Sequence, residues 1–578
     1  MRLKGFEIFM RTRLPSFFST GLALFSILVV STTPVGGWSK GVRDDRADLS
    51  LSGSYLAGRH AQNQKDLGVA ADYMVAALKK DPDNRDLTRR AFILLVADGR
   101  VDDAFPHARD VLKFDPGDPI AVATVAVHRI RQGAYRSAAA GLKAVASSGV
   151  NRFIVPVLRA WALFGEGRME EAKEVLAVAD ENEKTTGRLY ALHLGLMADL
   201  SGDGQTAIRH FETILHGPAG ISFRLAEVLG NLYHRAGRVP EARKIYDAYR
   251  KARPLSRLLD PALKALGGKP LPRPIASPED GVAEALFDIA SSLRRRNARE
   301  SALVMGRLAL YSRPAHGAAR ILVADILEMN NQLEAANAIY AKTERTSPFW
   351  WETQLRRALN LNHLGETKSA VRILTELAEA DETWVDPMIN LGDILRRSGR
   401  YDEAINIYDE AEKRVGVLQK HHWPLLYARG IALERSGRWD EAEKDFLEAL
   451  AFNPNQPYIL NYLGYSWVDK GRNLEQAQGM IRRAVKLRPN DGFIVDSLGW
   501  IYFKLGNFEK AVAALERAVE LRPQDPVIND HLGDAFWRVG RTFEARFQWR
   551  RAASFDPKPE MMDKIAEKLR NGLESSGQ

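Results

Sequence analysis

The sequence predicts an all-α fold in which pairs of antiparallel helices stack side by side into a solenoid. Three observations lead to this prediction. An alanine recurs about every 34 residues, a glycine precedes this alanine by five or six residues, and a proline follows it by twelve. A fixed period in this range is typical of a stacked repeat, in which one helix pair buries its apolar faces against its neighbours.

The recurring alanine is expected to open the second helix of each pair. A small residue there lets the two helix backbones approach closely, and enlarging it would overpack the contact by about 1–3 kcal/mol. The glycine fits the end of the first helix, where a left-handed backbone costs it little. The proline stops the second helix because it has no amide hydrogen to donate. The 14 alanines are Ala70, Ala104, Ala138, Ala172, Ala207, Ala242, Ala302, Ala336, Ala370, Ala404, Ala442, Ala477, Ala511 and Ala545.

The most regular part of the chain is residues 493–557, where framework residues recur at an offset of 34. The matching pairs are Leu498 and Leu532, Gly499 and Gly533, Tyr502 and Phe536, Gly506 and Gly540, Ala511 and Ala545, Leu515 and Trp549, Ala518 and Ala552, Pro523 and Pro557. This pattern, with its L-G-x-x-Y, A-x-x-x-F and terminal proline, resembles the tetratricopeptide repeat (TPR). The resemblance implies a right-handed superhelix of about fourteen helix-turn-helix repeats.

The chain after residue 37 also resembles the exported TPR proteins of Gram-negative bacteria, and its last three repeats resemble a type found in alphaproteobacteria. This resemblance implies a protein-interaction scaffold in the periplasm or at a face of the cell envelope. It implies no enzymatic activity and names no ligand.

The spacing of 60 residues between Ala242 and Ala302 interrupts the repeats. We therefore expect an N-terminal block of about six repeats at 50–256 and a C-terminal block of about eight at 283–559. Residues 257–282 between them are basic and rich in proline, which favours a semi-rigid spacer with a short capping helix. The spacer is either solvated or in contact with an anionic surface such as membrane head groups.

The C-terminal residues 560–578 are expected to cap the last repeat. Met562, Ile565, Leu569 and Leu573 fall on one side of a helix, which suits a terminal helix with a polar outer side.

Residues 1–37 have the order of a secretory signal. A basic start is followed by an apolar run of about 14 residues and then by small, turn-forming residues. The run is shorter than the roughly 20 residues of a spanning helix, so we expect cleavage after Gly37. The alternative is an uncleaved membrane anchor, and in either case the rest of the chain would face the far side of the membrane.

The composition excludes several classes of protein. The chain has no cysteine, so it has neither disulfides nor thiolate metal sites. Of its net charge of +9, residues 1–37 carry +3, and the remainder is too dilute for a nucleic-acid-binding face. We expect no nucleic-acid partner.

The stretch 525–541, DPVINDHLGDAFWRVGR, brings a histidine, carboxylates and a tryptophan together. His531, Asp534 and Trp537 nevertheless occupy ordinary repeat positions. The sequence has no phosphate-binding loop, zinc-protease motif or nucleophile elbow. We expect no catalytic residues, no metal, no cofactor and no small-molecule substrate.

A groove lined by the first helices is the expected binding site. In this repeat, positions two, five, nine and twelve of the first helix face the groove, and in the last four repeats they include many aromatic and acidic residues. Such residues suit peptide recognition, although inter-repeat packing would explain them equally well. The candidate residues are Tyr427, Asn461, Tyr465, Asp496, Trp500, Phe503, Asp530, Asp534 and Trp537.

Related TPR modules clamp a terminal carboxylate with asparagine and basic residues. Asn231 holds such a position but lacks a basic set beside it, so a basic or apolar peptide is the better expectation. The sequence thus predicts a non-enzymatic envelope scaffold that binds proteins or peptide segments. The alternatives are a membrane-tethered adaptor of an envelope assembly or export machine, and an enzyme whose carboxylates, Asp496, Asp530 and Asp534, would converge.

Overall fold

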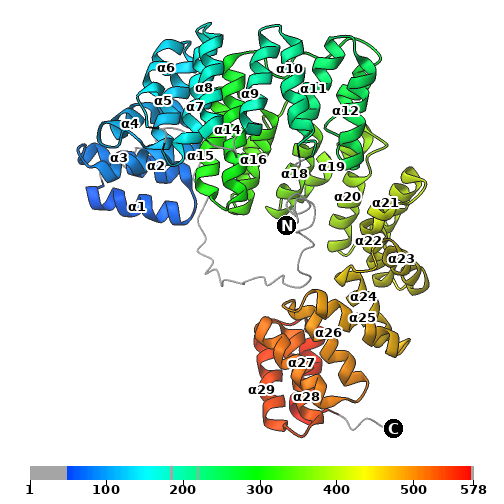
Figure 1. Ribbon diagram of the computed structural model, residues 1–578. Helices are drawn as coiled ribbons and strands as arrows, with labels where there is room; N and C mark the ends of the chain where they lie inside the picture. The colour runs from blue at the N-terminus through cyan, green and yellow to red at the C-terminus, as the bar shows by residue number, and fades with distance from the viewer. Residues whose placement is uncertain (1–48, 147, 183–186, 218–219, 574–578) are drawn as a thin grey trace, which may run out of the picture. The chain divides into compact units, whose positions relative to one another are not determined.

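The computed structural model describes residues 49–146, 148–182, 187–217 and 220–573, which form helices and turns without a β-strand (Figure 1). These residues group into two compact units. The N-terminal unit ends at Asn390 and the C-terminal unit begins at Leu391, within helix α20 (Asp386–Arg397). The predicted signal or anchor at residues 1–37 lies outside the described residues. Within the described part of the chain, no helix combines the length and the hydropathy of a membrane span.

The N-terminal unit holds the helices before α20. They are α1 (Leu51–Asn63), α2 (Leu67–Lys80), α3 (Arg85–Asp98), α4 (Val101–Phe114), α5 (Pro119–Arg131), α6 (Tyr135–Lys143), α7 (Asn151–Gly165), α8 (Met169–Asn182), α9 (Gly187–Leu200), α10 (Gly204–Leu215), α11 (Phe223–Arg235), α12 (Val239–Ala252), α13 (Asp260–Ala265), α14 (Pro278–Arg295), α15 (Arg299–Ser312), α16 (Gly317–Met329), α17 (Leu333–Tyr340), α18 (Trp350–His363) and α19 (Thr367–Ala380).

The C-terminal unit holds the helices after α20. They are α21 (Tyr401–Val415), α22 (Trp423–Arg435), α23 (Trp439–Phe452), α24 (Pro457–Asp469), α25 (Leu474–Leu487), α26 (Gly492–Lys504), α27 (Phe508–Leu521), α28 (Pro526–Arg538), α29 (Thr542–Ser554) and α30 (Pro559–Asn571), with a short 3₁₀ turn at Lys420–His422.

The helices pair as the periodicity predicts. Each of the 14 recurring alanines lies in the second helix of a pair, and none is more than 1% exposed. The close approach that requires small residues is visible at Gly499, where a Cβ atom would come within 2.4 Å of Leu515 on the second helix. The predicted all-α repeat solenoid is confirmed.

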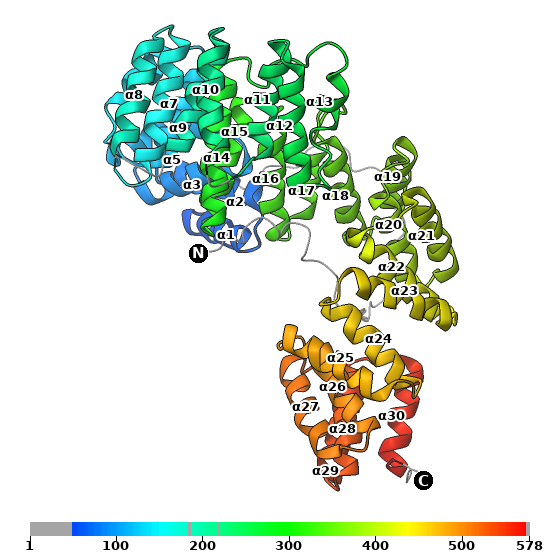
Figure 2. The ribbon, with the colours of Figure 1, turned by 45° about the vertical axis from the view of Figure 1, so that its right-hand side comes forward.

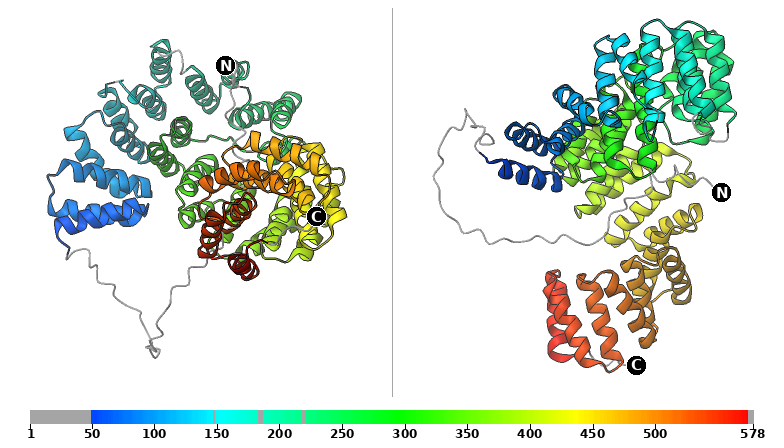
Figure 3. Two further views of the ribbon diagram at one scale, coloured as in Figure 1. Left: turned by 90° about the horizontal axis from the view of Figure 1, so that it is seen from below. Right: turned by 60° about the vertical axis from the view of Figure 1, so that its left-hand side comes forward.

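The N-terminal unit packs against itself in a way that a simple stack of repeats does not. Helices α14 and α15 lie against α3, α5, α7 and α9, which are first helices of the early pairs. We call the side formed by these four helices the inner face. Seen from below in Figure 3, the green α14 to α16 lie inside the arc of the blue and teal helices. The inner face of the early repeats is therefore filled by the chain itself.

Close side-chain contacts hold these helices on the inner face. Gly281 of α14 leaves room for the fully buried Trp161 of α7, whose ring would come within 2.2 Å of a Cβ atom there. From α15, Arg307 donates a hydrogen bond to the carbonyl of Ala97 over 3.0 Å. The extra helices are thus fitted to the surface that they cover.

A buried carboxylate anchors α14 to its neighbours. Glu284 is 0% exposed and lies 2.7 Å from the guanidinium of Arg224 on α11 and 3.1 Å from the ring of His316, which caps α16. Burial alone would raise the pKa of Glu284, but Arg224 and His316 hold it below its ordinary value. The carboxylate is therefore ionised and shared by three parts of the unit.

The segment 257–282 differs from the expected spacer. It contains the short helix α13, but its backbone packs on the repeats, because the amide of Asn231 donates to the carbonyls of Leu271 and Pro272 over 2.9 and 3.1 Å. Its arginines also have acidic partners: Arg257 pairs with Asp381, and Arg273 lies 3.6 Å from Asp199. The segment lies inside the N-terminal unit, and the chain divides within α20 instead.

The contact at Gly281 gives a test of the filled inner face. We expect Gly281→Ala to lower the free energy of unfolding by about 1–3 kcal/mol, because the new methyl group overlaps the ring of Trp161. The matched control is Gly479→Ala in α25, where nothing lies within 4 Å. That variant should be neutral or up to about 1 kcal/mol more stable, since alanine is the better helix former. Urea denaturation followed by circular dichroism measures both, and equal effects would contradict the packing.

Candidate partner-binding surface

The nine predicted binding residues lie on four consecutive first helices of the C-terminal unit. Tyr427 is on α22, two residues are on α24, three on α26 and three on α28. Helix α24 packs on α26, and α26 packs on α28, so the residues occupy equivalent places on neighbouring helices. Their surroundings differ from residue to residue.

Tyr427 belongs to the core. It is 5% exposed, and its ring lies 6.1 Å from that of Phe446 and 6.2 Å from that of Tyr462. Tyr427 is therefore a packing residue that a partner does not reach.

The residues of α26 form a stacked column with α28. The ring of Trp500 lies 5.0 Å from that of Phe503 and 4.0 Å from that of His531, both nearly parallel to it. The ring of His531 also shares a hydrogen bond with Asp496 through its Nδ1 atom over 2.9 Å. Asp496 and His531 are buried, whereas Trp500 and Phe503 are partly exposed. The column therefore joins a buried ion pair to a partly exposed aromatic surface.

The histidine of this column has a shifted pKa. Burial alone would lower the pKa of His531, but the charge of Asp496 and its hydrogen bond raise the pKa above the ordinary value of 6.5. Asp530 and Asp534 act in the same direction. The protonated ring thus neutralises Asp496 beneath the tryptophan.

Residues on helix α30 (Figure 2) and just after it contact the three candidate residues of α28. The ammonium group of Lys568 donates to Asp530 and Asp534, each over 2.8 Å. Gly572, just after the helix, leaves room for Trp537, whose ring would come within 2.1 Å of a Cβ atom there. Asp530, Asp534 and Trp537 therefore hold the end of the chain in place.

The terminal helix turns a slightly different side inward from the one expected. Ile565 is fully buried and Leu569 and Leu573 pack beside it, as predicted, but Met562 is 38% exposed. Its neighbour Met561 packs against the core cluster in its place.

Six of the nine candidate residues are partly exposed, and two of these, Asp530 and Trp537, contact the end of the chain. Asn461, Tyr465, Trp500 and Phe503 are partly exposed on the neighbouring helices α24 and α26. Two polar atoms among them, Oδ1 of Asn461 and Nε1 of Trp500, are covered and have no hydrogen-bond partner. Each such atom costs about 1–3 kcal/mol in the unbound protein. The surface thus offers partly exposed aromatic area beside two buried polar atoms that the folded chain leaves unpaired.

Each of the three candidate carboxylates pairs with a cationic side chain of the same unit. Asp496 pairs with His531, and Asp530 and Asp534 pair with Lys568. The described residues include no group of three or more side chains placed to hold a metal ion. These three carboxylates are therefore part of the packing of the C-terminal unit.

The ion pair under the column makes stability depend on pH. Because the pKa of His531 is raised on folding, its contribution is complete below pH 6.5 and is lost as the pH rises through the folded value. We expect His531→Gln to cost about 3–5 kcal/mol at pH 6, since it strands the buried Asp496, and less at higher pH. Urea unfolding at a series of pH values measures the difference. The exposed His421→Gln is the control, and a cost that grows with pH would refute the assignment.

Comparisons with known proteins agree with this architecture. The family model described as a tetratricopeptide repeat matches residues 55–119, 193–257, 389–457 and 427–492, and a second one, a TPR repeat, matches 499–540. A TPR repeat-containing protein of Pseudomonas aeruginosa is 29% identical over 181 residues, which cover 25% of this chain and 31% of that protein. The BBSome complex member BBS4 of Bos taurus is 25% identical over 143 residues, which cover 25% of this chain and 26% of that protein.

The chain thus matches less than a third of the length of either relative. Among solved structures, the APC/C hetero-tetramer Cut9-Hcn1 aligns with 91% of this chain and 97% of its own, at 16% identity and a TM-score of 0.39. The repeat models match both units, and the recurring alanines are buried at every helix pair. The chain therefore belongs to the tetratricopeptide repeat family.

Proposed function

We propose that this protein is a scaffold of the bacterial cell envelope that binds peptide segments of other proteins on the first helices of its C-terminal unit. TPR proteins bind other proteins or peptides, which is the general part of this function. The observation that supports the specific part is the set of partly exposed aromatic side chains on α24 and α26, namely Tyr465, Trp500 and Phe503.

The chemistry of this surface favours an apolar peptide. The ring of Trp500 is partly exposed and stacks on that of Phe503, which gives the surface a pair of apolar rings. The aromatic rings of Tyr465 and Phe503 add rigid apolar area, which usually dominates the affinity of such sites. A basic peptide gains less than the sequence suggested, because the nearby carboxylates already have cationic partners.

The N-terminal unit supports the same assignment. Its inner face, where a partner of a TPR stack would bind, is filled by α14 and α15. Among the described residues of the C-terminal unit, no helix covers α24 and α26 in this way, and Asn461, Tyr465, Trp500 and Phe503 are partly exposed there.

The envelope location rests on the sequence of residues 1–37, which has the order of a secretory signal. The absence of cysteine fits export to an oxidising compartment. A second candidate, a membrane-tethered adaptor of an envelope assembly or export machine, is favoured if the apolar run of that segment stays uncleaved.

The binding surface is tested by affinity capture from envelope extract with the full chain as bait. We expect the double variant Tyr465→Ala and Phe503→Ala to retain at least about tenfold less of the specific partner, since two central anchors at a hot spot contribute about 2 kcal/mol each. The control is Phe543→Ala, which removes a ring that is 88% exposed on α29 of the same unit. Quantitative mass spectrometry compares the baits, and urea unfolding checks that all three are folded. Equal capture by the folded double variant would disprove the surface.

The location is tested by a reporter enzyme that is active only after export, fused to the C-terminus of the full chain. We expect the fusion to be active, and N-terminal sequencing of the purified protein to start near Trp38. An intact Met1 with an active reporter would instead indicate the tethered adaptor. An inactive reporter beside a correctly folded chain would overturn the envelope location.

A further inference from the structure

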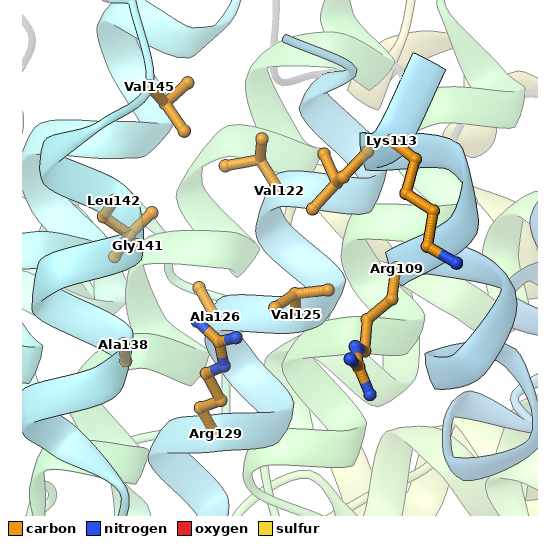
Figure 4. Close-up of a pocket in the computed structure, with 11 residues that line it drawn as sticks. Arg109, Lys113, Val122, Val125, Ala126, Arg129, Ala138, Gly141, Leu142 and Val145 are labelled. Atoms are coloured by element: carbon orange, nitrogen blue, oxygen red, sulfur yellow. The ribbon is translucent and has the colours of Figure 1, made fainter. Parts of the chain in front are cut away.

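A cavity of about 310 Å³ opens on the N-terminal unit between α4, α5 and α6 (Figure 4). It is separate from the inner face and from the C-terminal surface. Ligand sites in proteins begin at about this size and combine an apolar lining with a few placed polar groups.

The cavity lies beside a short second helix. Helix α6 has 9 residues, whereas the equivalent α4 has 14. The sequence after Lys143 is rich in small residues, and Gly149 has a left-handed backbone with a φ of 56°. The helix therefore stops early, and the apolar side of α5 that its last turns would cover is left facing a cavity.

The floor of the cavity is aliphatic. Val122, Val125 and Ala126 of α5 form it, with Leu142 of α6 at one side. In Figure 4 the three valines and the leucine among the labelled residues surround the opening. No aromatic ring and no side-chain hydroxyl, amide or carboxylate lies among the described lining residues. Such a floor suits an alkyl chain better than a peptide backbone, which would bring polar groups without partners.

The rim is cationic. Arg109, Lys113 and Arg129 line the cavity, and no acidic residue does. Lys113 has a surface ion pair with Asp110 over 2.7 Å, whereas the structure gives neither arginine a carboxylate partner among the described residues. Two guanidinium groups are thus left to bind an anion beside an aliphatic floor.

One of these arginines is held in position. Arg129 donates to the carbonyl of Ser137 over 3.2 Å, and a Cβ atom at Gly141 would come within 2.9 Å of its guanidinium. A glycine inside a helix costs about 1 kcal/mol relative to alanine. At Gly141 this cost has a local reason, because the missing side chain leaves space for the arginine at the rim.

We propose that this cavity binds an aliphatic chain that ends in an anionic head group, with the chain on the α5 floor and the head group between Arg109 and Arg129. Guanidinium groups bind carboxylates and phosphates through charge-assisted hydrogen bonds, which are about twice as strong as neutral ones. The source of the ligand is either a free fatty acid or an anionic lipid of a membrane. This site does not depend on the peptide-binding surface proposed above.

The site is tested by titrating the full chain with dodecanoate in a calorimeter, below the concentration at which micelles form. We expect binding that the cationic analogue dodecyltrimethylammonium does not reproduce. The double variant Arg109→Gln and Arg129→Gln should bind at least about tenfold more weakly, because it removes both charge-assisted contacts. Gly141→Ala should also weaken binding while leaving the helix content unchanged, since it displaces Arg129.

The matched control is Lys143→Gln, which removes an exposed charge of α6 outside the cavity lining and should bind dodecanoate as the wild type does. Flotation with phosphatidylglycerol vesicles separates the two sources. Loss of vesicle binding in the double arginine variant assigns the ligand to a membrane lipid, and no vesicle binding assigns it to a free fatty acid. Absence of dodecanoate binding, equal binding by all variants, or binding of an acidic peptide in its place would overturn the proposal.

Discussion

The arrangement of the N-terminal unit depends on one carboxylate that water does not reach. Glu284 is shared between Arg224 and His316, so it ties α14 to α11 and to the start of α16. Removing one partner of such a buried pair costs about 3–5 kcal/mol, because the other charge stays buried alone. The pair fixes α14 beside Trp161, and α15 follows it onto the early first helices. The filled inner face is therefore a consequence of this one electrostatic contact and of the close packing around Gly281.

The two units consequently offer different surfaces to other molecules. The N-terminal unit has given its inner face to its own helices and keeps an aliphatic cavity with a cationic rim on α4, α5 and α6. In the C-terminal unit, α28, which is the first helix of the last pair, holds α30 in place. Aromatic side chains remain partly exposed on α24 and α26. Tyr427 and Tyr465 lie on equivalent helices of neighbouring repeats, yet Tyr427 packs in the core whereas Tyr465 is partly exposed and belongs to the proposed binding surface.

The repeat architecture was predictable because each helix pair requires the same kind of residue at the same place. A small residue such as Ala511 is required wherever two helices cross closely, so the spacing of these alanines along the sequence marks every helix pair. The contacts of α14 were not predictable in this way, because Gly281 and Glu284 meet residues more than fifty positions away that no period connects to them. The same limit explains the nine candidate residues: their positions followed from the repeat, but the coverage of Trp537 by Gly572 depends on where the chain returns after the last repeat.

The self-filled inner face also affects how the chain folds. In an ordinary repeat array each repeat contacts only its neighbours, so folding can begin anywhere and spread. Here α14 packs on α5 and α7, and these contacts close a loop of more than a hundred residues. Closing such a long loop slows folding, and it makes the N-terminal unit fold cooperatively as a whole. During synthesis, the apolar side of α7 with Trp161 stays uncovered until α14 has left the ribosome. The early repeats therefore pass through a stage in which they need protection from aggregation, and the later repeats of the same unit end that stage.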